Sequence, residues 1–291
     1  MHMKNLKKAV LPVAGFGTRF LPATKSIPKE MFPIIDKPLI QFAVDEAISA
    51  GVSEVIFVLS KSKKSIKNYF DHSDELITEL KSKGRHSLIK SIKDIRKRNI
   101  KFSFVNQNHA LGVGDAILRA EKLIGDSPFA VIFPDDLIKA KTTCLSNMLA
   151  KFNNRIDAVI AVQRIPREDI EKYGIVNYQK NVKKIYDVES IIEKPKPNTV
   201  KSNLAVVGRF ILTPKIFKFL RQIKPGHSNE LQLTDALDIL AKDHIVKAYE
   251  FAGKRFDCGS KIGLLKATMS YAKDHPEVRK EFMDIIKNED I

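Results

Sequence analysis

The first sixty residues alternate between continuous apolar runs and a helix-like pattern, and this alternation constrains the fold more than any other feature. Residues 9–11 with Val13 form an apolar run that ends at Gly15, and residues 55–59 form a second run. Between them, apolar side chains recur at helical spacing, at Leu39, Ile40, Ala43, Val44, Ala47 and Ile48. Continuous apolar strands separated by a helix are typical of parallel β–α–β units buried on both faces. The pattern therefore predicts an α/β fold.

The same alternation continues along the rest of the chain. Further strands are predicted at 102–105, 129–133, 157–163, 205–212 and 245–251, with helical stretches in most of the intervals. The segment 175–192 is polar and short-patterned, which favours a strand-rich excursion beside the sheet. No internal repeat or linker rich in Pro, Ser or Gly divides the 291 residues. We expect one Rossmann-like α/β domain over residues 1–291, with a mixed, mainly parallel sheet flanked by helices.

Charge and composition limit the partners of the chain. Fifty Lys and Arg residues against 34 Asp and Glu give a net charge of +16, which favours anionic partners. No apolar run approaches the roughly 18 residues of a transmembrane helix, and no signal-peptide layout is present. The two cysteines, Cys144 and Cys258, are far apart in sequence, which favours free thiols over a disulfide. We expect a cytoplasmic protein that has no membrane partner.

Part of the positive charge is concentrated in the segment 81–101. It holds nine Lys and Arg residues and a single acid, Asp94. Two interpretations are open, a solvated helical face or an RNA-binding patch. The segment lacks the interleaved aromatic residues and the recognisable module of a nucleic-acid-binding protein. The solvated face is therefore favoured, and no nucleic-acid partner is expected.

The segment 14–19, Ala-Gly-Phe-Gly-Thr-Arg, must turn sharply out of the first predicted strand. Its two glycines permit positive φ and let backbone N–H groups approach an anion closely. Two common nucleotide-binding motifs are excluded, because the dinucleotide fingerprint requires glycine where Phe20 stands and no Gly-Lys-Ser/Thr follows. A lone Gly-x-Gly is weak by itself, since many strand-to-helix turns contain one. The turn indicates a phosphate site of another type.

Four prolines follow this turn within the seventeen residues 22–38 and predict a stiff, non-helical path over the strand ends. Such a path would hold Arg19 and Lys29 near the glycine turn. A guanidinium clamps phosphate oxygens bidentately, and an ammonium adds a point charge. Taken singly, each cation is better explained as a surface residue of a basic chain. Their order and spacing together favour a phosphate site.

Polar side chains also follow later predicted strands, at the edge where ligands bind in such sheets. Gln107 follows the strand 102–105, and Asp135 follows the strand 129–133. A carboxylate that ends an apolar strand is out of place in a core, so Asp135 is the best candidate for a Mg²⁺ ligand. The alternative is that Asp135 caps a helix starting after Asp136.

The segment 15–31 closely resembles the opening motif of the sugar-phosphate nucleotidyltransferases. Its Leu-Pro-Ala-Thr-Lys and Pro-Lys-Glu-Met portions look like those of the bacterial UTP–glucose-1-phosphate uridylyltransferases. Further similar motifs are Gln107 with Gly112, Pro134-Asp135, Tyr173-Gly174, Glu193-Lys194-Pro195, and the segments 203–209, 230–236 and 257–259. The sequence departs from the family pattern at Asp115, where His often follows the glycine pair, and in the segment 81–101. The resemblance covers roughly residues 6–272.

The resemblance implies a nucleotide-diphospho-sugar transferase fold. Its nucleotide-binding half would span about 6–140 and its sugar-binding half about 141–272, followed by a C-terminal helical tail at 273–291. The implied reaction joins UTP and glucose 1-phosphate to give UDP-glucose and pyrophosphate, with Mg²⁺ and without a covalent intermediate, in a homodimer or homotetramer. Two alternatives remain open: thymidylyl or other nucleotidyl transfer to a sugar 1-phosphate, and a catalytically silent regulator that binds nucleotide sugars.

The resemblance also implies roles for single residues. The expected catalytic cations are Arg19, Lys29 and Lys194. The expected nucleotide-binding residues are Ala14, Gly15, Gly17, Thr18, Glu30, Gln107 and Gly112. The expected sugar-binding residues are Gly174, Glu193 and Val206, and the expected metal ligands are Asp135 and Asp257. Lys194 could instead lie in an exposed proline-stiffened turn, and Asp257 could instead form a turn before Gly259.

Overall fold

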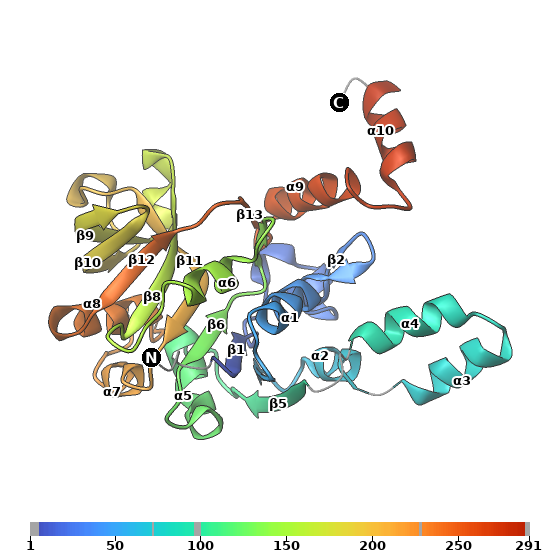
Figure 1. The fold of residues 1–291 in the computed structure, drawn as a ribbon, viewed down its shortest axis with the longest axis horizontal. Coiled ribbons are helices and arrows are strands. Elements are labelled where there is room, and N and C mark those ends of the chain that lie inside the picture. The colour runs from blue at the N-terminus through green and yellow to red at the C-terminus, as the bar shows by residue number, and fades with distance from the viewer. Residues whose placement is uncertain (1–5, 72, 96–99, 227–228, 289–291) are drawn as a thin grey trace.

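A nine-stranded sheet forms the centre of the computed structural model, which describes residues 6–71, 73–95, 100–226 and 229–288 (Figure 1). In spatial order its strands are β5 (Lys101–Asn106), β4 (Glu54–Leu59), β1 (Lys8–Pro12), β6 (Phe129–Ile132), β11 (Leu204–Leu212), β8 (Ala158–Arg164), β12 (Val246–Glu250), β10 (Ile185–Glu193) and β9 (Gly174–Val182). Two short pairings lie outside it, β2 (Pro33–Ile34) with β3 (Lys37–Pro38) and β7 (Asp136–Lys139) with β13 (Lys254–Asp257). The strands predicted from apolar runs are all present.

The sheet is mixed, as predicted. Strands β5, β4, β1 and β6 are mutually parallel, and β12 is parallel to β8. Strand β11 runs antiparallel to both β6 and β8, and β10 runs antiparallel to β12 and β9. The predicted predominance of parallel pairs therefore holds only for the first half of the sheet. Apolar runs do not reveal such a reversal, because a buried strand has the same composition in either direction.

The segment 175–192 forms strands, as predicted, but these strands do not lie beside the sheet. They belong to the hairpin of β9 and β10, which extends the main sheet through β12. The start of β9 also pairs with β11, where Val176 lies opposite Leu204. Residues of β9 are buried at this start and exposed at the far end, so the hairpin curls away from the core. The buried start places Gly174 at the base of the site.

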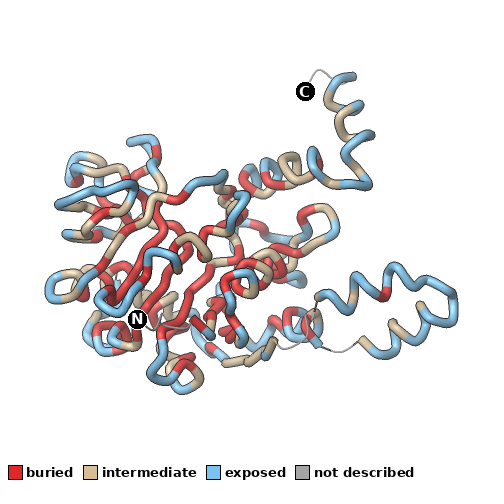
Figure 2. The backbone as a smooth tube through the Cα atoms, in the orientation of Figure 1, coloured by how far each residue is buried: buried red, intermediate tan, exposed pale blue. Residues whose placement is uncertain are grey.

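Helices cover both faces of the sheet. One face is covered by α1 (Leu39–Ser49), α2 (Lys64–Tyr69) and α6 (Cys144–Leu149), and the other by α5 (Val113–Ile124), α7 (Ile216–Leu220) and α8 (Leu233–Asp243). Side chains of each strand alternate between the two cores, so that Val10 belongs to one cluster and Leu11 to the other. The buried residues are concentrated in this sheet and in the helices packed on it (Figure 2).

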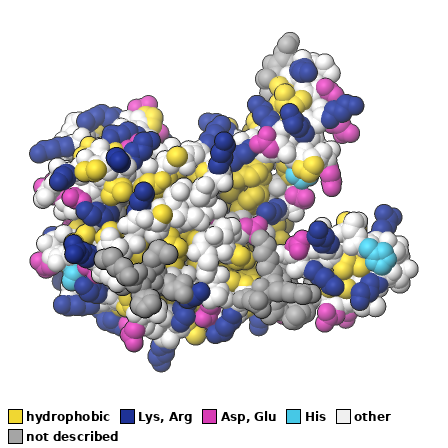
Figure 3. Space-filling model, viewed as in Figure 1, with side chains coloured by type: hydrophobic (Ala, Val, Ile, Leu, Met, Phe, Trp, Pro, Cys, Tyr) yellow, Lys and Arg dark blue, Asp and Glu magenta, His cyan; other side chains and the backbone are white. Residues whose placement is uncertain are grey.

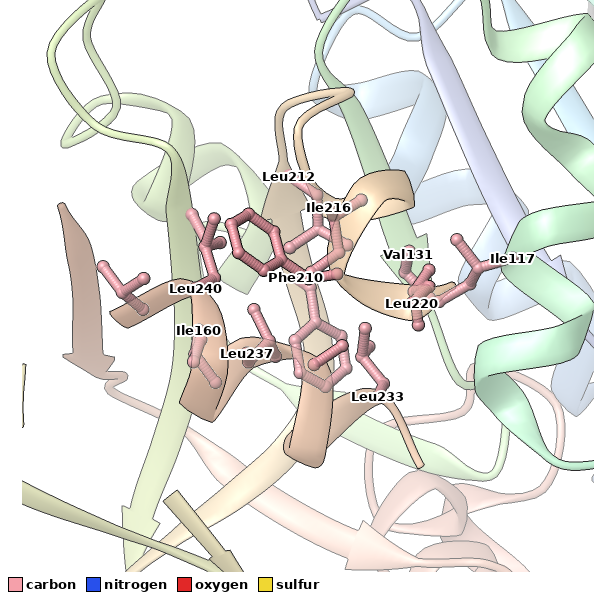
Figure 4. Packing of buried hydrophobic residues seen from close by; sticks show 14 of the residues in the cluster. Ile117, Val131, Ile160, Phe210, Leu212, Ile216, Leu220, Leu233, Leu237 and Leu240 are labelled. Carbon is pink, nitrogen blue, oxygen red and sulfur yellow. The ribbon is translucent and has the colours of Figure 1, made fainter. Parts of the chain in front are cut away.

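The packing of α8 against β11 shows how the ends of the strands are fixed in place. Phe210 of β11 is almost wholly buried and lies among Leu233 and Leu237 of α8 (Figure 4). Removing a buried aromatic ring of this kind costs about 3–5 kcal/mol of stability. Such packing gives the loops at the carboxyl ends of the strands a rigid base.

Two helical arms project from the sheet (Figure 1). One contains α3 (Asp74–Ser82) and α4 (His86–Ile95), and the other contains α9 (Lys261–Ala272) and α10 (Arg279–Asn288). Helices α3 and α10 have no buried residue, and α4 buries only Ile89. Lys and Arg side chains cover much of the first arm (Figure 3), as expected for a solvated basic segment, although residues 96–99 of that segment lie outside the described residues. None of the helices in the described ranges is long and apolar enough to cross a bilayer.

Candidate active site

The glycine turn predicted after the first strand leads into three short 3₁₀ helices. These are η1 (Thr18–Phe20), η2 (Ala23–Lys25) and η3 (Lys29–Met31). Gly17 adopts a φ of 66°, and its carbonyl accepts a hydrogen bond of 2.9 Å from Oγ1 of Thr24. A Cβ at Gly17 would lie 3.1 Å from Cγ2 of Thr24, whereas a Cβ at Gly15 would meet nothing within 4 Å. Gly17 is therefore required by the backbone conformation of the turn. Gly15 has no side chain, so the space next to the turn remains open.

A cavity of about 210 Å³ lies at the carboxyl ends of β1, β5 and β6. Predicted residues that line it are Ala14, Gly15, Lys29, Glu30, Gln107, Gly112 and Asp135. Gly17 and Thr18, also predicted to bind the nucleotide, line neither this cavity nor the larger one beside it. Glu230 lines the wall as well and was missed by the sequence analysis, although it stands in the motif 230–236. The cavity gathers most of the residues expected to bind a nucleotide.

Gly112 lies where the loop before α5 passes the loop before α8. Its φ is 92°, and a Cβ there would lie 2.7 Å from the carbonyl oxygen of Leu231. The Leu231 N–H donates to the carbonyl of Leu111, so the two loops are held backbone to backbone. Only glycine fits both the backbone angle and this close approach.

We expect Gly112→Ala to lower the free energy of unfolding by about 2–4 kcal/mol, because it adds overpacking to left-handed strain. The matched control is Gly51→Ala, which has a φ of 89° but no atom within 4 Å of its Cβ position. The control should lose only about 1 kcal/mol. Urea unfolding of both variants measures the difference, and equal losses would show that the contact with Leu231 has no energetic effect.

Gln107 projects into this cavity from the end of β5. Its Nε2 donates to Oδ2 of Asp115 at 2.7 Å and to the carbonyl of Gly112 at 3.0 Å. Among the described residues, no group donates a hydrogen bond to its Oε1. Oε1 is also not one of the fully buried polar atoms that lack a hydrogen-bond partner, so part of its surface is accessible. The Oε1 atom therefore remains open to the cavity. The protein itself takes both protons of Nε2, so Gln107 offers a ligand only the acceptor end of its amide.

Asp135 lies at the junction of the small cavity and a larger one, and it lines both. Its Oδ2 lies 2.5 Å from Nζ of Lys29, and both side chains keep about a fifth of their surface exposed, 23% and 22%. Burial by itself would raise the pKa of Asp135, but the Lys29 charge outweighs it and the pKa is lowered. Burial likewise lowers the pKa of Lys29, but the charges of Asp135 and Glu30 outweigh this effect and raise it. Both groups remain charged at neutral pH.

The alternative role for Asp135, as the cap of a following helix, is wrong. Residues 136–139 form strand β7, which pairs with β13. Asp136, which opens β7, is buried and accepts hydrogen bonds from the Gly208 N–H at 2.9 Å and from Arg255. Asp136 directly follows Asp135 in the sequence, yet no role was predicted for it. It anchors the strand that follows the junction.

A buried ion pair lies beneath Lys29. Nζ of Lys63 lies 2.7 Å from Oε2 of Glu30, with 7% and 2% of the two side chains exposed. Burial raises the pKa of Glu30 and lowers the pKa of Lys63, in each case against the attraction of the partner charge. Lys63 was missed because it stands among several lysines before α2, and no spacing in the sequence connects it to Glu30. The pair holds η3, and with it Lys29, against α2.

The larger cavity has a volume of about 1290 Å³ and extends from Asp135 towards the β9–β10 hairpin. Predicted residues that line it are Arg19, Asp135, Gly174, Glu193, Lys194, Val206 and Asp257. Glu193 accepts a hydrogen bond of 2.9 Å from Oγ1 of Thr234, and a Cβ at Gly174 would lie 3.0 Å from Oε2 of Glu193. Lys194 follows with a φ of 45° and a side chain that is 60% exposed. The lack of a side chain at Gly174 thus leaves the Glu193 carboxylate accessible.

Asp257 and Asp135 approach each other across Gly259. A Cβ at Gly259 would lie 3.0 Å from Oδ1 of Asp257, 3.1 Å from Oδ2 of Asp135 and 3.7 Å from Nη1 of Arg19. Burial, followed by the nearby charges of Asp136 and Asp135, raises the pKa of Asp257. Its Oδ1 also accepts from the Gly259 N–H at 3.1 Å, so the predicted turn is present as well. Two carboxylates and a guanidinium thus converge at the junction.

The chain matches the family of nucleotidyl transferases over residues 8–274. A UTP–glucose-1-phosphate uridylyltransferase 2 of Streptococcus pyogenes serotype M1 is 44% identical over 284 residues, which cover 96% of this chain and 94% of the relative. A solved UDP-glucose pyrophosphorylase complexed with UDP-glucose is 43% identical, with a TM-score of 0.84 over 93% of this chain and 100% of that one. A UTP-bound enzyme from Acinetobacter baumannii is 41% identical. Its TM-score is 0.89, and the match covers 97% of this chain and 99% of that one.

Proposed function

The chain belongs to the nucleotidyl transferase family, and on this premise we propose that it transfers a uridylyl group from UTP to glucose 1-phosphate, releasing UDP-glucose and pyrophosphate. The observation that carries the proposal is the pair of adjoining cavities that share Asp135. The smaller one suits a nucleotide and the larger one suits a sugar phosphate, so the α-phosphorus would lie at the junction. An oxygen of glucose 1-phosphate attacks it in line with the leaving pyrophosphate.

The chemistry requires charge neutralisation more than proton transfer. A phosphate monoester has a second pKa of about 6, so the nucleophile is mostly dianionic at neutral pH and needs no strong base. The obstacle is repulsion between two polyanions, which positioned cations relieve. Lys29 and Arg19 lie at the junction and are proposed to neutralise the triphosphate. Lys194, at the far wall, is proposed to hold the phosphate of the sugar. A single displacement then needs no covalent intermediate.

The walls of the two cavities suit the other groups of the substrates. Ala14, Gly15 and Gly112 leave space for the base and ribose, and the open Oε1 of Gln107 accepts the N3–H of uracil. Glu193, an acceptor only when ionised, is proposed to take hydrogen bonds from glucose hydroxyls beside Gly174 and Val206. Gly17 and Thr18 are proposed to support the phosphate turn from outside the cavity, and Glu30, which is almost wholly buried, from the cavity wall.

The junction also suits a magnesium ion. Mg²⁺ uses one or two carboxylates and completes its shell with phosphate oxygens and water. Asp135 and Asp257 face one point and would be the two carboxylates that hold the ion. When bound, the ion would supply positive charge to the phosphates of the nucleotide. We expect turnover to require added Mg²⁺ and to be lost on chelation; full activity in excess chelator would contradict this assignment.

Two wider proposals follow from the resemblance and from the cysteines. The family resemblance supports a homodimer or homotetramer, which light scattering would measure.

Cys144 and Cys258 are both buried and free, as predicted, and burial raises the pKa of Cys258 to about 12. Two unreactive thiols suit the reducing cytoplasm that we propose as the location.

Pyrophosphate release across a panel of nucleotides and sugar 1-phosphates tests the proposed function. We expect the highest kcat/KM with UTP and glucose 1-phosphate. Faster turnover of dTTP than of UTP would reassign the enzyme to thymidylyl transfer. Absence of pyrophosphate release with every pair would revive the silent regulator.

A further inference from the structure

Asp115, where the resemblance led us to expect a histidine, lies behind the wall of the smaller cavity, next to the residues that line it. It stands in the first turn of α5, with 13% of its side chain exposed. Arg119, one helical turn later, donates from Nε to Oδ2 at 2.7 Å and from Nη2 to Oδ1 at 3.2 Å. A carboxylate held in this bidentate way by a guanidinium is an acceptor only. Asp115 therefore presents an oxygen of fixed position to its neighbours.

That oxygen and the carbonyl of Gly112 together determine which way the Gln107 amide points. The amide Nε2 carries two protons, and they go to Oδ2 of Asp115 at 2.7 Å and to the carbonyl of Gly112 at 3.0 Å. A flipped amide would place Oε1 against two acceptor oxygens, with no proton to share. Gln107 is only 4% exposed, so water does not readily relieve the mismatch. The unflipped amide, with Oε1 towards the cavity, is therefore strongly favoured.

A histidine at this position would impose a weaker restriction. A neutral imidazole has one donor nitrogen and one acceptor nitrogen, and the tautomer adapts to its neighbour. Only the Gly112 carbonyl would then oppose the flipped amide. The carboxylate adds a second acceptor and so strengthens the preference for Oε1 towards the base.

We propose that Asp115 is a positioning residue for base selection, which acts by fixing the Gln107 amide so that its oxygen faces the base. An acceptor at that point pairs with the N3–H of uracil or thymine. Cytosine has no N3–H and places a lone pair there instead. The device thus favours UTP and dTTP over CTP without distinguishing the first two. This inference rests on the proposed function, because it assigns the smaller cavity to the base.

The test is Asp115→Asn, which keeps the size of the side chain but supplies an amide that can donate to Oε1 of Gln107. Steady-state kinetics with UTP, dTTP and CTP, each with glucose 1-phosphate, give three values of kcat/KM. We expect the UTP/CTP ratio to fall about 10-fold, because the flipped amide loses one of its two mismatches, the one with residue 115, and keeps the one with the Gly112 carbonyl. The UTP/dTTP ratio should stay within about twofold, since both bases carry N3–H.

The matched control is Glu79→Gln, which removes the carboxylate of another i,i+4 pair, on the exposed helix α3, where 60% of the Glu79 side chain is exposed. It should change neither ratio. Parallel losses with all three nucleotides in Asp115→Asn, or an unchanged UTP/CTP ratio, would overturn the inference. If that variant does not fold, Arg119→Gln replaces it and should lower the UTP/CTP ratio about two- to fivefold; an unchanged ratio there would also overturn it. A wild type that does not use UTP would instead overturn the proposed function.

Discussion

Asp135→Asn is expected to give a folded protein that forms UDP-glucose about 10³-fold more slowly than the wild type. The substitution keeps the size of the side chain but removes the charge that faces Lys29 and the point shared with Asp257. Electrostatic groups that act on a transition state are worth several kcal/mol, and each 1.36 kcal/mol is a tenfold change in rate. The loss should lie in kcat, because the junction is where the reacting phosphorus would lie. Initial rates at saturating UTP, glucose 1-phosphate and Mg²⁺ measure it.

The matched control for this prediction is Asp126→Asn, which removes the charge of an exposed aspartate from the loop before β6. It should retain wild-type turnover. Thermal unfolding of both variants separates a catalytic loss from a structural one. Turnover of Asp135→Asn within about threefold of the wild type would be incompatible with a metal or transition-state role for this carboxylate.

Lys194→Ala is expected to lower kcat/KM for glucose 1-phosphate about 10- to 100-fold and to leave the KM for UTP nearly unchanged. A charge-assisted hydrogen bond to a phosphate is worth about 1.5–3 kcal/mol, and Lys194 lines only the larger cavity. Its exposed side chain has no close acidic partner within the described ranges apart from Glu193, at 3.8 Å, so little stability should be lost. Kinetics with each substrate varied in turn measure the effect.

Lys196→Ala is the control, because this exposed lysine stands two residues further along the same turn and does not line the cavity. Its kinetic constants should match those of the wild type. If Lys194→Ala responded to glucose 1-phosphate as the wild type does, the residue would be the exposed cation of a proline-stiffened turn and nothing more.

Most strands and the glycine turn could be predicted because their signals are local. A buried strand needs consecutive apolar residues, and a sharp turn out of it needs glycine, so 9–15 and 55–59 were informative by themselves. The direction of β11 and the place of the β9–β10 hairpin depend on which strands meet in space. No local sequence pattern indicates which strands pair or in which direction they run.

The residues of the candidate site also differ in whether local sequence signals or contacts in space identify them. Asp135 was identified because a carboxylate at the end of an apolar strand is unusual. Lys63 and Asp136 were missed because their partners, Glu30 and Arg255, are distant in sequence. Gln107 was predicted to bind the nucleotide, but nothing in the sequence indicates that Asp115 and Gly112 take the donor end of its amide. Side-chain partners of this kind depend on the folded loops, so only the structure reveals them.

The central claim, transfer between two cavities that meet at Asp135, is tested most directly by following an isotope. The protein is incubated with Mg²⁺, unlabelled UTP and glucose 1-phosphate that carries ³²P, and the products are separated. The account predicts that the label appears in UDP-glucose, together with one equivalent of unlabelled pyrophosphate. A complete absence of label from UDP-glucose while UTP is present, or label in pyrophosphate, would contradict it.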